Sequence, residues 1–454
     1  MNAAPIHAAS AHPIPTKSNL ALGLVLGIWV LFLSFPALGR VPSRSVRSVS
    51  VLKGLVRVRA LPRMNAKVVG KIVASGRFPV LEVRASGKGC ASRWYRIGPR
   101  QWVCSGWIQP HAEPPTRIDD QVARFRQGTW LLNRTRRIPF YPSLRRLGAS
   151  NPRWLRVLAG FQVRSERFIG RRSFVHTATG GWVALSDTRP APVSRLVGID
   201  IPEGSRALPF AFVVTESAPI WKEKRGQVKA TSEVLSRYAA VRIQTRIEKD
   251  HQCFLRLLSG KLLRCEDARL APLPPPPPEG LAADALWLDI DGRNKILYAR
   301  KGKAVLRVML VSLGDATPSG LFLVKDKWLT LTLNMRYGKH PYFLENVPFV
   351  IFFWKGFALH EAYWHDGFGV TKSHGCINLS PADARWVFRF VNPALPAGFV
   401  WIKTTDPDKA SFVRVRGTHR RVRTPWKKYL IRRLKKSGPQ QDQTTPATAS
   451  PPSS

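Results

Sequence analysis

Short apolar runs, separated by turns rich in Gly, Ser or Pro, fill the first half of the chain. Runs of this length and spacing predict the strands of small antiparallel β-barrels. We therefore expect a first barrel module at residues 41–113. Its apolar runs are Val56–Ala60, Val68–Gly70, Phe78–Leu81, Trp94–Ile97 and Trp102–Val103.

A weak internal repeat extends this pattern along the chain. The pair Trp102-Val103 recurs 80 residues later as Trp182-Val183, and 80 residues further on as Leu262-Leu263. A repeat of this kind predicts related structural units. We expect second and third barrel modules at 114–200 and 201–271. The alternative is a chance similarity in a chain rich in Trp and Arg.

The five consecutive prolines at 274–278 predict an extended, semi-rigid spacer over residues 272–280. Beyond it, further apolar runs predict a β-rich domain at 281–408. One clear helix is expected after Ser380, because Ser is a favourable N-cap and Pro381 would occupy the first helical position. The expected fold class is therefore mostly β, a mixed β-sandwich or barrel with one helix, preceded by small β-barrel modules.

The two ends of the chain have distinctive compositions. Leu20–Leu38 is an almost unbroken apolar run between Lys17 and Arg40, long enough to span a bilayer. Small residues around Ala37 would also suit a signal peptidase, so residues 1–40 are expected to be a signal peptide or an uncleaved anchor. Residues 438–454 are rich in Gln, Thr, Pro and Ser and are expected to be disordered.

A formal net charge of +44 predicts an anionic partner. Residues 41–279 contain 43 basic and 16 acidic residues, whereas 280–408 contain 15 and 11. The basic segment 409–437 adds 12 basic residues and no acidic one. The charge favours attachment to an acidic polymer or membrane surface over a role in a substrate pocket. A nucleic-acid partner is not expected, because the chain has an export signal and no recognisable nucleic-acid motif.

The five cysteines divide into two local pairs and one remaining thiol. Cys90 and Cys104 are 14 residues apart, and Cys253 and Cys265 are 12 apart. In an exported chain this spacing predicts two disulfides that close hairpins, with Cys376 left as a reactive thiol. Four unpaired buried thiols are the alternative.

Cys376 follows His374 and Gly375, and a further histidine, His360, lies sixteen residues upstream. A thiol nucleophile needs a nearby base, and imidazole can supply it. Two other interpretations are a structural cysteine and a zinc site that includes His365. The spacing from His360 to His365 is i+5, which would not place both on one helix face. We expect no metal and no other cofactor.

The segment 358–388 resembles the active-site region of the L,D-transpeptidase (YkuD-type) catalytic domain family. His360, twelve intervening residues and the motif SHGCIN (Ser373–Asn378) match its signature. Upstream, TPSGLF (Thr317–Phe322) matches a second family feature. The likeness covers about residues 284–405. Separately, residues 45–112 resemble the bacterial Src-homology-3-type domains found beside wall enzymes.

The resemblance implies roles for individual residues. Cys376 would be the nucleophile and His360 its base, while His374 and Gly375 would border the oxyanion site. Ser373 and Asn378 would fix the loop. Glu361 departs from the family, where many members have Gly or Ser, although in some the backbone carbonyl at this position orients the base. The expected substrate-cleft residues are Thr317, Tyr363, Trp364 and His365.

These roles predict a cell-envelope, periplasmic enzyme that acts on peptidoglycan stem peptides through a Cys376 thioester. The acceptor would be the amine of another stem or of a protein. Hydrolysis of stem peptides at the same site and a non-catalytic wall-binding protein are the alternatives. The basic regions would bind anionic envelope polymer or lipid.

Overall fold

The computed structural model describes residues 45–86, 89–125, 128–146, 152–155, 157–202, 208–335 and 341–422. The apolar run Leu20–Leu38, residues 423–437 of the basic segment and the expected disordered tail lie outside these residues. Within the described ranges, no helix has the length and apolar character needed to cross a membrane. Strands dominate, so the prediction of a mostly β fold is confirmed.

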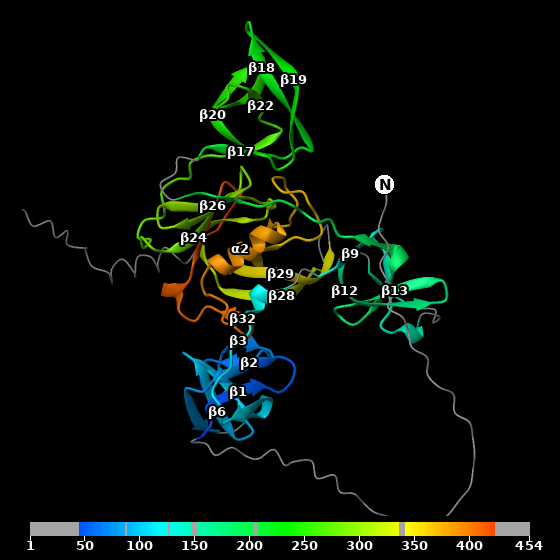
Figure 1. Cartoon of the computed structure of the whole chain (residues 1–454), viewed down its shortest axis with the longest axis vertical. Helices are drawn as coiled ribbons and strands as arrows, with labels where there is room; N and C mark the ends of the chain where they lie inside the picture. The colour runs from blue at the N-terminus through cyan, green and yellow to red at the C-terminus, as the bar shows by residue number, and fades with distance from the viewer. Residues whose placement is uncertain are drawn as a thin grey trace, which may run out of the picture.

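Three groups of short strands surround a larger C-terminal unit (Figure 1). The first module comprises β1 (Ser48–Val51), β2 (Val56–Arg59), β3 (Val68–Ile72), β4 (Arg77–Pro79), β5 (Glu82–Ala85), β6 (Arg93–Gly98), β7 (Gln101–Cys104) and β8 (Ile108–His111). The short helix α1 (Gln121–Arg124) follows. The second module comprises β9 (Trp130–Asn133), β10 (Ile138–Phe140), β11 (Arg153–Leu155), β12 (Leu158–Ile169), β13 (Arg172–Thr177), β14 (Trp182–Ala184) and β15 (Thr188–Pro190).

The third module follows the short strand β16 (Ile199–Asp200). It comprises β17 (Phe210–Val213), β18 (Ser217–Lys224), β19 (Gln227–Ser236), β20 (Ala240–Lys249), β21 (Gln252–Leu257), β22 (Leu262–Arg264) and β23 (Ala268–Ala271).

The C-terminal unit contains β24 (Leu286–Asp291), β25 (Ile296–Lys301), β26 (Ala304–Leu310), β27 (Pro318–Leu323), β28 (Asp326–Met335), β29 (Tyr342–Trp354), β30 (Phe357–Glu361), β31 (Ile377–Leu379), α2 (Pro381–Phe390), β32 (Phe399–Lys403), β33 (Phe412–Arg416) and β34 (Arg420–Arg421). Four 3₁₀ turns complete the described elements: Ser105–Trp107, Leu144–Arg146, Leu185–Asp187 and Pro407–Lys409.

The three modules share one pattern of strand pairing. In each, the first strand pairs antiparallel with the last: β1 with β8, β9 with β15 and β17 with β23. A hairpin precedes the last strand in each case: β6–β7, β13–β14 and β21–β22. The shared pairing supports the proposal that the sequence repeat reflects three related units.

The expected barrels do not close among the described residues. The first module divides into two sheets, and its strand β3 pairs with β2 on one side and with β32 of the C-terminal unit on the other. In the second module, β12 likewise pairs in parallel with β29. These edge strands are capped by the C-terminal unit, which removes the unpaired edge that closure would otherwise cover.

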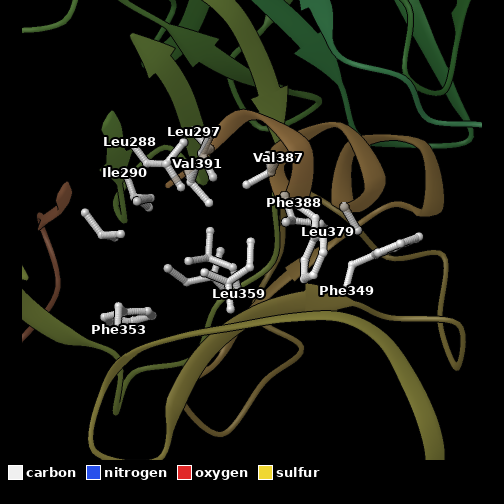
Figure 2. Packing of buried hydrophobic residues seen from close by; sticks show 14 of the residues in the cluster. Leu288, Ile290, Leu297, Phe349, Phe353, Leu359, Leu379, Val387, Phe388 and Val391 are labelled. Atoms are coloured by element: carbon white, nitrogen blue, oxygen red, sulfur yellow. The ribbon is translucent and has the colours of Figure 1, made fainter. Parts of the chain in front are cut away.

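The core of the C-terminal unit lies between its sheets and helix α2 (Figure 2). Leu288 and Leu297 come from one sheet, Leu359 and Leu379 from the strands that carry the candidate chemistry, and Phe388 from α2; each is at most 1% exposed. Burial of a side chain of this size contributes roughly 1.5–3 kcal/mol. The strands that carry the site are therefore firmly placed.

Helix α2 has the predicted start, and its C-terminal carbonyls bind a side chain from a distant strand. The Asp383 N–H donates to Ser380 Oγ at 3.3 Å, and Pro381 is the first helical residue, so the predicted N-cap is confirmed. At the other end, the buried Lys327 ammonium donates to the carbonyls of Phe388 and Val391. It satisfies orphan C-terminal carbonyls, and burial lowers its pKa to about 7.

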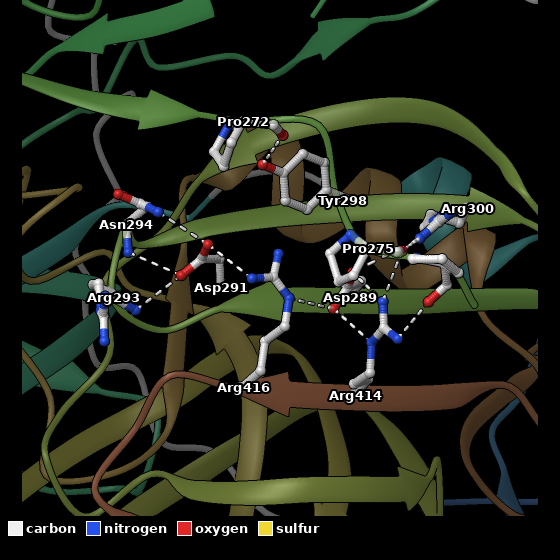
Figure 3. A network of polar contacts seen from close by, with 11 residues as sticks. Pro272, Pro275, Asp289, Asp291, Arg293, Asn294, Tyr298, Arg300, Arg414 and Arg416 are labelled. Atoms are coloured by element: carbon white, nitrogen blue, oxygen red, sulfur yellow. Dashed lines mark hydrogen bonds and ion pairs between the residues drawn. The ribbon is translucent and has the colours of Figure 1, made fainter. Parts of the chain in front are cut away.

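The proline spacer and the start of the basic segment are both integrated into the fold (Figure 3). Strand β33 pairs in parallel with β24 and antiparallel with β27, so the sheet continues past the expected boundary at Asp408. Arg414 contacts the buried Asp289 carboxylate with two hydrogen bonds of 2.9 and 2.6 Å and donates to Pro276 O. Arg300 donates to Pro275 O.

This network corrects two expectations from the sequence. Residues 272–276 lie against the sheet, because carbonyls in this run accept hydrogen bonds from its side chains. Arg414 and Arg416 neutralise Asp289 and Asp291. Phe412 and Val413 are core residues. This part of the basic segment is therefore unavailable to an external surface.

Both predicted disulfides are present. Cys90 is linked to Cys104 and Cys253 to Cys265, with Cα–Cα distances of 5.8 and 5.4 Å. Cys376 is the free cysteine of the described residues. The first bridge spans a hairpin of the first module and the second joins the β21–β22 region of the third.

Candidate active site

His360 lies on β30, and Cys376 directly precedes the neighbouring strand β31. Strand β30 pairs in parallel with β31, with His360 opposite Asn378. Cys376 lies in the bend that leads into β31, two residues before Asn378. Both residues line one cleft of about 700 Å³. The fold thus brings together the two residues singled out from the sequence.

The His360 ring has a defined orientation. Its Nδ1 lies 2.9 Å from the Glu361 carbonyl oxygen, an acceptor, so Nδ1 carries the proton and Nε2 is left unprotonated. The departure at Glu361 does not disturb this contact, because the backbone provides it. The ring is 2% exposed, and burial lowers its pKa to about 4.

Cys376 is a neutral thiol at rest. Burial raises its pKa to about 11, partly offset by a hydrogen bond from the backbone of Ala358. With the pKa of His360 lowered, the pair at neutral pH is thiol and imidazole rather than thiolate and imidazolium. An unprotonated Nε2 beside a thiol can accept the proton during attack, as in general-base catalysis.

Hydrogen bonds fix the loop that precedes Cys376. The Gly375 N–H donates to Ser373 Oγ at 3.0 Å, and the Thr317 hydroxyl donates to the Gly375 carbonyl at 2.9 Å. Gly314 packs so closely that a Cβ there would lie 1.8 Å from the Ser373 carbonyl oxygen. Gly314 and the Thr317 of the upstream TPSGLF motif therefore support the loop.

Asn378 and His365 form a second support behind the loop. The Gly367 N–H donates to His365 Nδ1 at 3.1 Å, and the Asn378 amide nitrogen Nδ2 lies 2.8 Å from His365 Nε2. The Asn378 backbone exchanges hydrogen bonds with Ser312 at 2.7 and 3.1 Å. Burial and the charge of Lys372 lower the pKa of His365 to about 4.

Of the four expected cleft residues, one lines the cleft and three do not. Trp364 lines the cleft, with its ring 5.5 Å from that of His360. Thr317 is fully buried beneath the loop, and His365 lies behind it. Tyr363 is 3% exposed and donates to the Glu345 carbonyl. Proximity to the motif in the sequence did not reveal which of these side chains line the cleft and which are buried beneath it.

Other cleft residues were not identified from the sequence. Tyr342, at the start of β29, contacts the exposed His374 ring at a centroid distance of 5.6 Å. Burial and the nearby Cys376 raise the pKa of Tyr342 to about 12. One wall comes from the second module, a contribution that no local motif signals. The wall residues are Asn133, Arg134, Thr135, Arg136, Val157, Leu158 and Arg189.

The described residues contain no group of three or more His, Cys, Asp or Glu side chains arranged to bind a metal ion. His360 and His365 each use Nδ1 in a hydrogen bond to the protein backbone. These contacts fix the orientations of both rings.

Residues 285–413 match the family model YkuD, the L,D-transpeptidase catalytic domain. The chain is 36% identical over 110 residues to L,D-transpeptidase 1 of Mycobacterium tuberculosis, which covers 22% of this chain and 43% of the relative. It thus spans less than half of that relative's length. Residues 285–413, which the family model matches, include His360, Cys376 and the loop that precedes Cys376.

Two solved structures are also similar to parts of the chain. An L,D-transpeptidase from Stackebrandtia nassauensis is 21% identical with a TM-score of 0.22, covering 30% of this chain and 58% of that one. The catalytic domain of the E. faecium L,D-transpeptidase is 23% identical with a TM-score of 0.24, covering 29% and 98%.

Proposed function

We propose that this protein is a cysteine acyltransferase that catalyses L,D-transpeptidation on peptidoglycan stem peptides. The observation that carries the proposal is that Cys376 and His360, whose Nε2 is unprotonated, line the same cleft. The family match over residues 285–413 supports the same reaction class. In this proposal Cys376 is the nucleophile and His360 the base.

The reaction has two steps. The Cys376 sulfur attacks the L-centre carbonyl of a tetrapeptide stem while His360 Nε2 takes the thiol proton. The C–N bond to D-alanine then breaks, and the departing amine takes that proton. In the second step an acceptor amine attacks the thioester, loses a proton to His360, and the Cys376 thiol is restored. The Cys376 backbone N–H would stabilise the oxyanion, because the Gly375 N–H already bonds Ser373.

Hydrolysis is the competing outcome at the same site, because water could resolve the thioester in place of an amine. The mainly apolar cleft beside Cys376, with Phe357, Leu333 and Met335 in its lining, favours the amine by limiting access of water. The acceptor is proposed to be a second stem or a protein lysine.

The proposed location is the cell envelope, and the basic modules would attach the protein there. Residues 41–279 carry a large excess of basic residues, whereas 280–408 are nearly balanced. Attachment to anionic polymer or lipid would keep the cleft close to an immobile substrate.

The test is to incubate the full chain with a purified stem tetrapeptide and separate dimers from shortened monomers. Wild-type protein should form dimers, and Cys376→Ala should form none while its circular dichroism is unchanged. Exposure to a carbapenem, followed by intact-mass measurement, should show one adduct on wild type and none on Cys376→Ala. Dimer formation by Cys376→Ala would refute the assignment, and shortened monomers alone would indicate hydrolysis.

A further inference from the structure

The cleft beside Cys376 has a pronounced charge asymmetry. Four of its lining residues are permanent cations, namely Arg134, Arg136, Arg189 and Lys372, and no lining residue is Asp or Glu. Three of the four come from the second module and not from the segment that matches the catalytic family. Among the described residues, none of these three arginines forms an ion pair within 4.0 Å.

The turn that presents Arg134 and Arg136 is fixed by one buried side chain. Asn133 is 7% exposed, and its amide nitrogen donates to the carbonyls of Thr135 and Val157, each at 2.7 Å. Its amide oxygen accepts from the Ala159 N–H at 2.9 Å. These contacts bind the turn to the start of β12 and preorganise its two cations at the cleft.

The third arginine lies on the adjacent strand. Arg189 is opposite Leu132 in the β9–β15 pair, and the Arg134 N–H donates to the Asp187 carbonyl at 2.9 Å. The end of β9 and strand β15 therefore place Arg134 and Arg189 at the same edge of this strand pair. This edge lines the same cleft as the loop that precedes Cys376, to which Lys372 belongs.

The wall has a fixed position relative to Cys376 because the second module is clamped to β29. Glu345 of β29 is fully buried, and its carboxylate accepts N–H donors of Gln162, Ala178 and Thr179 at 3.1, 3.0 and 3.2 Å. Trp130 stacks on Tyr363 with ring centroids 4.9 Å apart. A parallel strand pair, Leu158–Gly160 with Tyr342–Leu344, completes the junction.

We propose that Arg134, Arg136 and Arg189, with Lys372 opposite, form a carboxylate-binding subsite that selects stem peptides with free carboxylates over their amidated forms. This inference rests on the proposed function for the identity of the peptide. Amidation keeps the shape of a carboxyl group but removes its charge. Guanidinium groups distinguish the two because they form charge-assisted, bidentate hydrogen bonds with a carboxylate.

The test measures binding without turnover. The full-length Cys376→Ala protein is titrated calorimetrically with a stem tetrapeptide whose carboxylates are free and with the same peptide fully amidated. The free-acid peptide should bind roughly tenfold tighter. Replacing all three arginines by Gln should remove this preference and leave affinity for the amidated peptide unchanged. The matched control is Arg171→Gln, in the turn after β12 and outside the cleft, which should keep the preference.

The outcomes separate this inference from the proposed function. Equal affinity for acid and amide, a preference that survives the triple substitution, or no binding of either peptide would overturn the subsite. A preference that depends on the arginines supports it, even where wild type produces no dimers and the proposed reaction fails. Dimer formation without any preference would leave the reaction standing and the subsite refuted.

Discussion

The second and third modules share one strand pairing but contact different parts of the C-terminal unit. The second module joins β29 through Glu345 and supplies a wall of the cleft. The third contacts the loop between His365 and Val370. There the Tyr238 hydroxyl donates to the Asp366 carbonyl at 2.7 Å, and Arg269 donates to the Gly369 carbonyl at 2.7 Å.

The difference indicates that one scaffold can serve two purposes. In the second module, the cations face the cleft, so changes there should alter which substrate is bound. In the third module, cationic and phenolic side chains end on backbone carbonyls of a loop, so changes there should alter the positioning of the site for every substrate. The two kinds of change can be separated by measuring preference and turnover independently.

The largest effect is expected from breaking the second-module clamp. In Glu345→Ala, three backbone N–H donors and the Thr179 hydroxyl lose a buried acceptor, so the free energy of unfolding should fall by about 3–5 kcal/mol. Preference for the free-acid peptide should fall with it, although the three arginines remain. Urea denaturation and the calorimetric assay measure the two quantities.

The matched control is Glu233→Ala in the third module. Glu233 forms a surface ion pair with Lys261, and such a pair contributes at most about 1 kcal/mol. If Glu345→Ala were no more damaging than Glu233→Ala, the second module would not be clamped as described, and its wall could move relative to Cys376.

A second prediction concerns acid stability and the buried histidines His365 and His360. Burial, with smaller contributions from Lys372, His360 and the third-module Arg237, lowers the pKa of His365 to about 4. Burial does the same for His360. The unfolded value is about 6.5, so between pH 6.5 and 4 the unfolded chain binds protons that the folded chain does not. Stability is therefore complete above pH 6.5 and is lost as the pH falls towards 4.

The loss should be on the order of 3 kcal/mol for each histidine. Urea denaturation between pH 4 and 7 measures it, and comparison with His365→Gln isolates one residue from the carboxylates that titrate in the same range. The variant should retain only part of the pH dependence. A variant and wild type with identical pH dependence would show that folding does not lower the pKa of His365.

Several features of the fold followed from the sequence because they depend on local chemistry. Short apolar runs separated by turn residues predicted the strands. Ser380 and Pro381 predicted the start of α2, and cysteine spacing predicted both disulfides. The motif around Cys376 also singled out His360, and both residues line the same cleft. These inferences use residues that interact within a few positions or within one hairpin.

The other features depend on contacts between distant parts of the chain. Arg134 and Arg189 reach the cleft only because β12 pairs with β29, and no local pattern specifies that pairing. Tyr363 was expected in the cleft, but its ring stacks on Trp130 from the second module and is buried. Phe412, expected in an external basic segment, is paired with Trp287 inside the sheet.

The smallest expected effect comes from the third-module contact with the loop. Tyr238→Phe removes one hydroxyl, which donates to Asp366 O at 2.7 Å and lies 2.9 Å from its carboxylate. The net contribution of such a hydrogen bond is roughly 1 kcal/mol, so kcat should fall about three- to tenfold. Because Tyr238 acts through the loop, free-acid and amidated donors should be affected equally and KM should change little.

Steady-state kinetics with both donors measure this effect, and Trp221→Phe on β18 is the control. A change in donor preference would mean that the third module contacts the substrate directly, and the distinction between the two modules would then fail.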